Sequence, residues 1–403
     1  MNRLELTTGE EGTLNGDYGQ VKQKAMEILV ALGEIFKADR LIEIRSVQVA
    51  GVSYKTIGDA GLEWIRSMSS EQVTVPATLN PAGMDLHLWK QMGIQQEFAD
   101  KQLEIIDAYT NMGVKAICSC TPYLTGHSPK FGEHIAWSES SAVCYANSVL
   151  GARTNREGGP SALAAAIIGK TPNYGYHLDE NRQPTLRVNV EASVYEESDF
   201  GALGATIGRI VNNGVPYFSG IKNPGADSLK SLAAALAASG GVAMYHLDGV
   251  TPEATSVNLD GVEARTFTQE DLSASYEQLS TFQSGDVDVV TIGCPHASMS
   301  EMKKVATLIK GKKVAKNTKL WIFTSLATKL MAERFGYLGD IRRAGGEVYT
   351  DCCMVVAPVE QFGFKRMAIN SAKGAIYEPS ASKVDVLFGT TGRCVDIAVK
   401  GHA

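Results

Sequence analysis

The hydrophobic residues near the N-terminus follow a helical spacing interrupted by short apolar runs. Val21, Ala25, Leu29 and Leu32, for example, recur every three to four residues and fall on one face of a helix. The short runs between such segments are typical of β-strands. Helices are predicted over residues 18–37, 58–69 and 94–112, and strands over 41–52, 73–79 and 114–120. This alternation of strand and helix predicts a largely parallel sheet with helices on its faces.

The same alternation returns in the second half of the chain. Strands are predicted over 242–247, 287–293, 319–324, 347–351 and 384–388, and helices over 227–238, 298–310, 326–335 and 390–400. Residues 121–184, between the halves, are rich in Gly, Pro, Ser, Asn and Tyr, with helices predicted at 138–149 and 160–168. We therefore expect an N-terminal α/β part (1–125), a polar insertion that carries active-site loops (126–215) and a C-terminal α/β region (216–403).

Composition and charge exclude several classes of protein. The 403 residues carry a formal net charge of −6, which argues against a nucleic-acid-binding protein or a protein bound to an anionic membrane. No run of about 18 apolar residues predicts a membrane span, and the first residues lack the pattern of a signal peptide. We therefore expect a cytoplasmic protein, whose seven cysteines stay reduced and are available as ligands.

Five of the cysteines lie at the ends of predicted strands. They form three groups: Cys118 and Cys120, Cys294, and Cys352 and Cys353. The carboxyl ends of parallel strands meet at one edge of a sheet, where ligand sites form. Neighbouring residues of an extended segment point to opposite sides, so only one of Cys352 and Cys353 is expected to be a ligand. Cys118 and Cys120 could share a face, but Cys120 lies next to the turn at Thr121 and Pro122, and the simplest expectation is one ligand from each group. Three thiolates on a four-iron cluster would leave one iron open to substrate.

The alternative is that these cysteines are ordinary core residues, because cysteine is among the most buried residue types. Cys144, within a predicted helix, and Cys394, near the C-terminus, are interpreted in that way. A structural zinc site is disfavoured, because its ligands usually come in close pairs. The glycines at 201, 204 and 208 resemble a dinucleotide-binding pattern, but they fall within a predicted helix and indicate close helix packing.

Longer motifs resemble those of the aconitase X family. They are residues 120–124 (CTPYL), 132–141 (GEHIAWSESS), 146–161 (ANSVLGARTNREGGPS), 293–296 (GCPH), 351–356 (DCCMVV) and 370–373 (NSAK). They occur in the family's order from about residue 40 to the C-terminus. The resemblance implies an aconitase-like fold of several parallel α/β units, with the site at the carboxyl ends of strands. It also implies an iron–sulfur cluster, expected as 4Fe–4S, on Cys120, Cys294 and Cys353.

The family resemblance implies a hydro-lyase, and two substrates are known in the family. Segments 49–56 (VAGVSYKT) and 79–83 (LNPAG) are similar to the members that dehydrate (R)-mevalonate 5-phosphate to trans-anhydromevalonate 5-phosphate in an archaeal-type isoprenoid pathway. The alternative is a cis-3-hydroxy-L-proline dehydratase. A second alternative, from another class of protein, is a non-catalytic iron–sulfur or zinc scaffold.

Candidate site residues follow from these motifs and from the needs of the elimination. His134, Glu133 and His296 are the candidates that handle the departing hydroxyl group or orient the cluster. The candidate substrate-binding residues are Gly51, Val52, Ser53, Asn80, Pro81, Asn155, Arg156, Ser371 and Lys373. In this set Arg156 is expected to clamp a carboxylate and Lys373 to add positive charge for the phosphorylated hydroxy acid.

The family resemblance also implies a partner. In the aconitase superfamily a mobile fourth domain, the swivel domain, supplies a serine as the base. We expect this chain to lack that domain and a separate small subunit to provide it. The alternative is an internal base among Ser138, Ser140 and Ser141, although serines at the start of a helix are more often caps.

Overall fold

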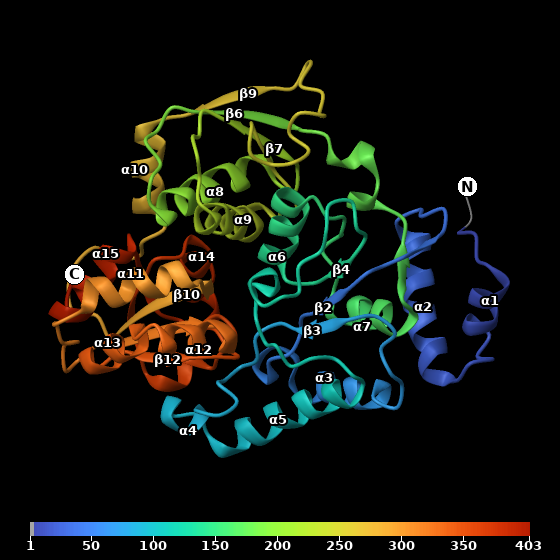
Figure 1. Cartoon of the computed structure of the whole chain (residues 1–403), viewed down its shortest axis with the longest axis horizontal. Coiled ribbons are helices and arrows are strands. Elements are labelled where there is room, and N and C mark those ends of the chain that lie inside the picture. The colour runs from blue at the N-terminus through green and yellow to red at the C-terminus, as the bar shows by residue number, and fades with distance from the viewer. Residues whose placement is uncertain (1–3) are drawn as a thin grey trace.

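The computed structural model describes residues 4–403, which form three α/β units in chain order (Figure 1). In the first unit a parallel sheet has the strand order β3-β2-β4, and β1 pairs antiparallel with β5. Its elements are α1 (Thr8–Leu14), α2 (Gln20–Ile35), β1 (Leu41–Glu43), β2 (Val47–Val49), α3 (Tyr54–Met68), β3 (Ala77–Leu79), α4 (Trp89–Met92), α5 (Gln96–Asn111), β4 (Ala136–Trp137), α6 (Ser140–Tyr145), the π-helical turn η2 (Ala146–Leu150), α7 (Gly159–Ile168) and β5 (Lys170–Pro172).

The second unit is a four-stranded parallel sheet in the order β8-β7-β6-β9. Its elements are β6 (Leu186–Val190), α8 (Glu197–Val211), β7 (Pro216–Ser219), α9 (Ala226–Gly240), β8 (His246–Leu247), β9 (Ala264–Phe267) and α10 (Gln269–Gln278). The glycines of α8 allow its close contact with α9, because a Cβ atom on Gly204 would lie 2.9 Å from the Leu232 carbonyl oxygen. The prediction that these glycines serve helix packing is confirmed.

The third unit is a five-stranded parallel sheet in the order β12-β11-β10-β13-β14. Its elements are β10 (Val289–Ala297), α11 (Met299–Ile309), β11 (Lys319–Thr324), α12 (Leu326–Arg334), α13 (Tyr337–Ala344), β12 (Glu347–Tyr349), β13 (Arg366–Ile369), α14 (Ala372–Ala381), β14 (Asp385–Phe388) and α15 (Thr391–Lys400). Hydroxyl side chains at the strand ends cap the following helices, as Ser298, Ser371 and Thr390 do for α11, α14 and α15. The predicted class, several parallel α/β units, is confirmed.

Two local predictions differ from the structure. No strand forms over 114–120, where only Lys115 makes a bridge with Thr78. The left-handed backbone of Cys118, with φ of 46°, prevents an extended strand there. The segment expected as a polar insertion is divided between two units: β4 joins the first sheet, and β6 with α8 belongs to the second.

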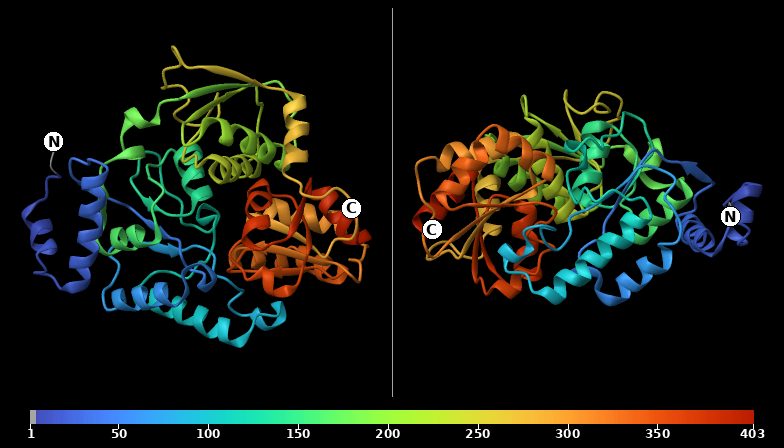
Figure 2. Two further views of the ribbon diagram at one scale, coloured as in Figure 1. Left: turned by 180° about the vertical axis from the view of Figure 1, so that it is seen from behind. Right: turned by 60° about the horizontal axis from the view of Figure 1, so that its bottom comes forward.

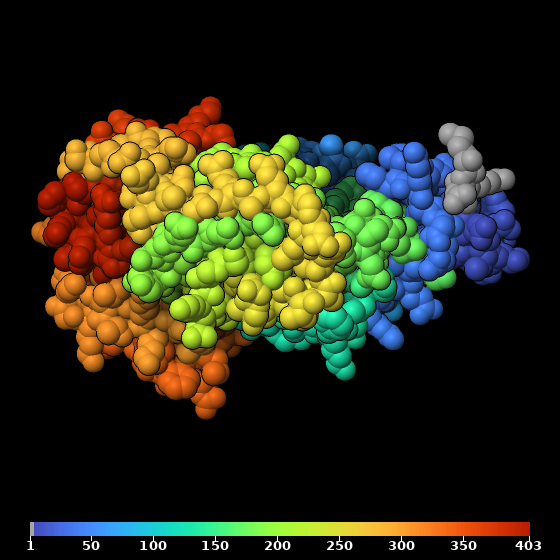
Figure 3. Space-filling view, turned by 90° about the horizontal axis from the view of Figure 1, so that it is seen from above, coloured from blue at the N-terminus to red at the C-terminus, as the bar shows by residue number. Residues whose placement is uncertain are grey.

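The three units meet around a common centre. The first and third units lie at opposite ends of the long axis, and the second unit covers the space between them (Figures 1 and 2). Seen from above, the green and yellow atoms of the second unit fill the middle of the surface (Figure 3). No helix among residues 4–403 is long and apolar enough to cross a membrane.

Candidate active site

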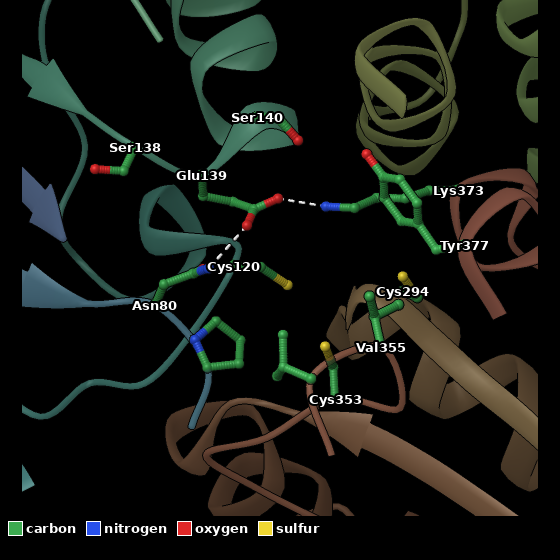
Figure 4. A pocket seen from close by; sticks show the side chains of 12 residues that line it. Asn80, Cys120, Ser138, Glu139, Ser140, Cys294, Cys353, Val355, Lys373 and Tyr377 are labelled. Carbon is green, nitrogen blue, oxygen red and sulfur yellow. Dashed lines mark hydrogen bonds and ion pairs between the residues drawn. The ribbon is translucent and has the colours of Figure 1, made fainter. Parts of the chain in front are cut away.

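A cavity of about 230 Å³ lies between the first and third units. The first unit contributes Asn80, Pro81, Cys120, Ser138, Glu139 and Ser140, and the third contributes Cys294, Cys353, Val355, Val356, Lys373 and Tyr377. Figure 4 shows the sulfur atoms of Cys120, Cys294 and Cys353 pointing toward the same space, beside the ion pair between Glu139 and Lys373. The structure therefore brings together one cysteine from each predicted group.

The exposure of the cysteines separates those at the cavity from those in the core. Cys120, Cys294 and Cys353 keep 4%, 6% and 7% of their surface exposed. Their neighbours Cys118 and Cys352 are at 0%, and so are the remaining two cysteines of the chain. Neither Cys118 nor Cys352 is among the residues that line the cavity.

Each cysteine-bearing segment turns sharply just before the cysteine that faces the cavity. Cys118, Gly293 and Asp351 have left-handed φ angles of 46°, 104° and 65°. A Cβ atom on Gly293 would lie 2.0 Å from the Phe323 carbonyl oxygen, so this position requires glycine. For Cys118 and Asp351 such a conformation costs about 1–3 kcal/mol each, which the surrounding contacts must offset. Strain of this kind is typical of functional sites.

A buried polar network forms one wall of the cavity. Lys373 Nζ, on α14, forms an ion pair with Glu139 and donates to Ser141 Oγ at 3.2 Å. Asn80 Nδ2 donates to the other carboxylate oxygen of Glu139 at 2.8 Å. Burial opposes ionisation of Glu139, but the Lys373 ammonium and these hydrogen bonds hold the pKa of its carboxyl below the ordinary value. The pair therefore places a buried, charged ammonium at the cavity.

His296 lies behind the cavity and does not line it. Its imidazole is fully buried and contacts the Cys352 carbonyl oxygen and the Ser119 hydroxyl. Burial lowers the pKa of this imidazole to about 4, so the ring is neutral at ordinary pH. His296, predicted as a catalytic residue, therefore lies close to the cysteines, while other side chains line the cavity.

The other two predicted catalytic residues lie elsewhere in the first unit. His134 Nδ1 is 2.9 Å from His177 Nδ1, and Glu133 accepts a hydrogen bond from the Lys130 N–H at 2.9 Å. Within the described residues 4–403, neither side chain is among those that line the cavity. Burial, followed by nearby arginines, lowers the pKa of His134.

The predicted substrate-binding residues divide into two groups. Asn80, Pro81 and Lys373 line the cavity, and Ser53 supports it by donating from Oγ to the Val356 carbonyl oxygen at 2.7 Å. Ser371 caps α14, where its Oγ accepts from the Gly374 N–H. Gly51 lines a separate apolar hollow of about 200 Å³, and the Val52 carbonyl accepts from Gln102 at 2.8 Å.

Arg156 lines a second hollow of about 450 Å³ that adjoins the cavity. The two spaces share Ser138, Ser140 and Tyr377 as lining residues. Asn155 is turned away, because its amide bonds the Tyr174 carbonyl and the Tyr176 N–H within the first unit. Of this predicted pair, the structure brings only Arg156 near the cavity.

Sequence reasoning missed Glu139 as a site residue, although it lies inside a recognised motif. Glu139 is the N-cap of α6 and accepts from the Ser141 N–H at 3.3 Å. A carboxylate flanked by serines at the start of a helix is ordinarily a cap, so no local signal distinguished it. Tyr377, one turn after Lys373 on α14, was also missed.

The donor set of the cavity fits an iron–sulfur cluster. Among residues 4–403, no three His, Cys, Asp or Glu side chains converge to hold a single metal ion. The cysteines instead line one cavity from both units, as ligands to different irons of one cluster would. Burial raises the pKa of Cys120 to about 12 and that of Cys294 to about 11, while Lys373 lowers both. Such thiols lose their protons when a metal binds, because the ligand is the thiolate.

Comparisons with known proteins agree with this arrangement. The models for the first, second and third domains of aconitase X match residues 3–180, 184–277 and 287–400. The phosphomevalonate dehydratase large subunit of Methanocaldococcus jannaschii is 53% identical over 96% of this chain and 98% of its own length. That of Methanosarcina mazei is 50% identical over 99% and 98%.

Two further matches are a dehydratase named for a different substrate and a solved structure. The cis-3-hydroxy-L-proline dehydratase of Hypocrea jecorina is 32% identical over 99% of this chain but only 69% of its own length. The crystal structure of Thermococcus kodakaraensis aconitase X in its holo-form superimposes with a TM-score of 0.91 at 47% identity, over 98% of this chain and 100% of that one. The relatives named here by activity are dehydratases. With three consecutive domain models and a solved structure matched along nearly the whole chain, this protein belongs to the aconitase X family.

Proposed function

We propose that this chain is the cluster-binding subunit of a hydro-lyase that converts (R)-mevalonate 5-phosphate to trans-anhydromevalonate 5-phosphate. The observation that carries the proposal is the single cavity where three cysteines from distant segments face a buried lysine. Relatives about 50% identical over nearly their whole length carry the name phosphomevalonate dehydratase large subunit. The hydroxyproline dehydratases are 32% identical, and this chain spans about 70% of their length.

Cys120, Cys294 and Cys353 are proposed to hold a 4Fe–4S cluster with one iron free of cysteine. When bound, such a cluster supplies a Lewis acid for the hydroxyl group that leaves. The exposed fractions of these cysteines support the choice over Cys118 and Cys352, which are fully buried.

Lys373 is proposed to stabilise negative charge on the substrate. Its ammonium faces the cavity, and Glu139 keeps it oriented and charged. As the proton α to the substrate carboxylate is removed, negative charge develops on that carboxylate, and a fixed ammonium in a buried site stabilises it strongly. Asn80 and Pro81 also line the cavity and are proposed as contacts to the substrate. Arg156, in the adjoining hollow, is proposed to bind a second anionic group.

The base that removes this proton is proposed to be a serine of a separate small subunit. The names of the relatives, which call them large subunits, support a second chain. Of the three serines considered as an internal base, two form other hydrogen bonds: Ser141 Oγ donates to Glu139 at 2.8 Å, and Ser138 Oγ donates to the Gly158 carbonyl oxygen at 3.4 Å. Ser140 lines the cavity. Docking of the second chain over the cavity would also exclude water from the reaction.

The proposal predicts a substrate-specific and partner-dependent activity. With an anaerobically reconstituted cluster and the small subunit added, the protein should form anhydromevalonate 5-phosphate from mevalonate 5-phosphate. Without the partner the rate should fall by about 100-fold or more, because the general base is missing. Product formation is followed by mass spectrometry, with cis-3-hydroxy-L-proline as the parallel substrate.

Three outcomes would contradict parts of this proposal. Full activity of the chain by itself would place the base within it. Comparable turnover of cis-3-hydroxy-L-proline would favour the alternative dehydratase. A bound cluster with no turnover of either substrate in the presence of the partner would favour a non-catalytic scaffold.

A further inference from the structure

The His296 side chain contacts two of the three cysteine-bearing segments and belongs to the third. It lies on β10, two residues after Cys294. Its Nε2 is 2.8 Å from the carbonyl oxygen of Cys352, and its Nδ1 is 3.1 Å from the hydroxyl of Ser119. Its backbone N–H also donates to Cys120 Sγ at 3.2 Å. One residue therefore joins the segments that carry all three cavity cysteines.

The partners determine which ring nitrogen carries the proton. A backbone carbonyl only accepts hydrogen bonds, so Nε2 is the protonated nitrogen and donates to Cys352. Nδ1 then accepts from the Ser119 hydroxyl. Ser119 is itself held by its neighbours, because its carbonyl accepts from Gln48 of β2 at 2.9 Å and its Oγ accepts from the Thr121 N–H at 3.2 Å. Both ring nitrogens are thus used in fixed hydrogen bonds.

The second unit also contacts His296. Lys230, on α9, is 2% exposed and donates from Nζ to the His296 carbonyl oxygen at 3.1 Å. The ammonium also pairs with Glu301 at the start of α11 and with Asp227 at 3.1 Å. A buried cation with two carboxylate partners keeps a defined position. Through this lysine the second unit also contributes to the placement of the cysteine-bearing segment of β10.

We propose that His296 is a positioning residue, which holds the three cysteine-bearing segments in the arrangement that the cluster requires. This inference rests on the proposed function, in which Cys120, Cys294 and Cys353 are the ligands. The left-handed turns before these cysteines are conformations that need support from outside the segment. The hydrogen bonds of His296 supply that support on the side away from the cavity.

The test compares variants that keep or remove the Nε2 donor. His296→Gln retains an amide donor that reaches the Cys352 carbonyl, whereas His296→Ala removes the donor and the contact with Ser119. The matched control is His246→Ala, because His246 is also fully buried and its Nε2 contacts a backbone carbonyl, that of Arg182, at 2.8 Å. Iron retention against a competing chelator and thermal unfolding are measured for all four proteins.

We expect His296→Ala to weaken iron binding by about 10- to 100-fold, as loss of an outer contact to a metal ligand typically does. His296→Gln should restore most of the binding, and His246→Ala should bind iron as the unaltered protein does. In the apo-protein, amide hydrogen exchange over residues 117–121 and 351–356 should be faster in His296→Ala and near normal in His296→Gln.

Two results would overturn the inference. The first is unchanged iron retention and exchange in His296→Ala, and the second is a glutamine variant as defective as the alanine variant. If the unaltered protein binds no iron, the proposed function fails, yet the exchange measurement on the apo-protein still decides whether His296 positions these segments. Global unfolding of His296→Ala is recognised from its thermal transition. In that case iron retention and hydrogen exchange of the glutamine variant decide the question.

Discussion

Replacement of Cys120, Cys294 or Cys353 by alanine should abolish iron retention and dehydratase activity. Each substitution removes one of the three sulfurs at the cavity, and no other cysteine of the chain has exposed surface there. A Lewis-acidic iron contributes several kcal/mol to the stabilisation of the transition state. Its loss should therefore lower kcat by about three orders of magnitude or more. Iron and sulfide content per chain and the rate with mevalonate 5-phosphate are the measurements.

The chain offers matched controls at neighbouring positions. Cys118→Ala and Cys352→Ala remove cysteines that lie within two residues of a proposed ligand but are fully buried away from the cavity. Cys144→Ala is a third control, in which a core cysteine on α6 is removed. These three variants should keep their iron. Full iron content in all three cavity variants would refute the ligand assignment, and loss of iron only in the controls would move the assignment to the neighbouring cysteines.

Lys373→Met should lower both stability and activity, because it leaves the Glu139 carboxylate buried without its partner. Removing one member of a buried ion pair costs about 3–5 kcal/mol in the free energy of unfolding. The double variant Lys373→Met/Glu139→Gln should recover much of this stability, since neither side chain then carries a charge. Denaturant unfolding of the apo-protein and a double-mutant cycle measure the coupling between the two residues.

Activity should not recover together with stability. A charge-assisted contact of about 1.5–3 kcal/mol between Lys373 and the substrate corresponds to a loss of about one to two orders of magnitude in kcat/KM. The double variant should retain this loss. The control is the exposed pair Lys312 and Asp396, 3.5 Å apart, whose disruption should cost at most about 1 kcal/mol. Recovery of activity in the double variant would show that Lys373 acts only on stability.

The sequence predicted helices better than strands, for a physical reason. Long amphipathic helices such as α2 and α5 bury one face, and their apolar periodicity is visible along the chain. Several strands are only two to four residues long, which is too short for a periodic signal. Strand β9 is almost entirely exposed, so it lacks the apolar pattern of a buried strand. Strand β7 is buried but begins at a proline, a residue that argues against a strand in the interior of a sheet.

The second unit illustrates a different limit. Leu186, Val188 and Val190 of β6 alternate with polar residues and are all buried, so this strand had a signal. The surrounding region is rich in glycine and polar residues, and this composition favours an insertion over a strand. Pairing of β6 with β7 and β9 unites residues up to about 80 positions apart, and such pairing is not visible from local composition.

The sequence by itself determined the class of fold, the family and the three groups of cysteines, because these depend on periodicity and on motifs that are continuous along the chain. Only the tertiary structure showed which cysteine of each group has surface exposed at the cavity. It placed Cys120 and Cys353 at the cavity and turned Cys118 and Cys352 away, through left-handed turns that no propensity predicts. It also paired Glu139 with Lys373, which lie 234 residues apart, and put His296 behind the cysteines. Such contacts arise when separate units pack together, and the local sequence around a residue does not indicate which unit will pack against it.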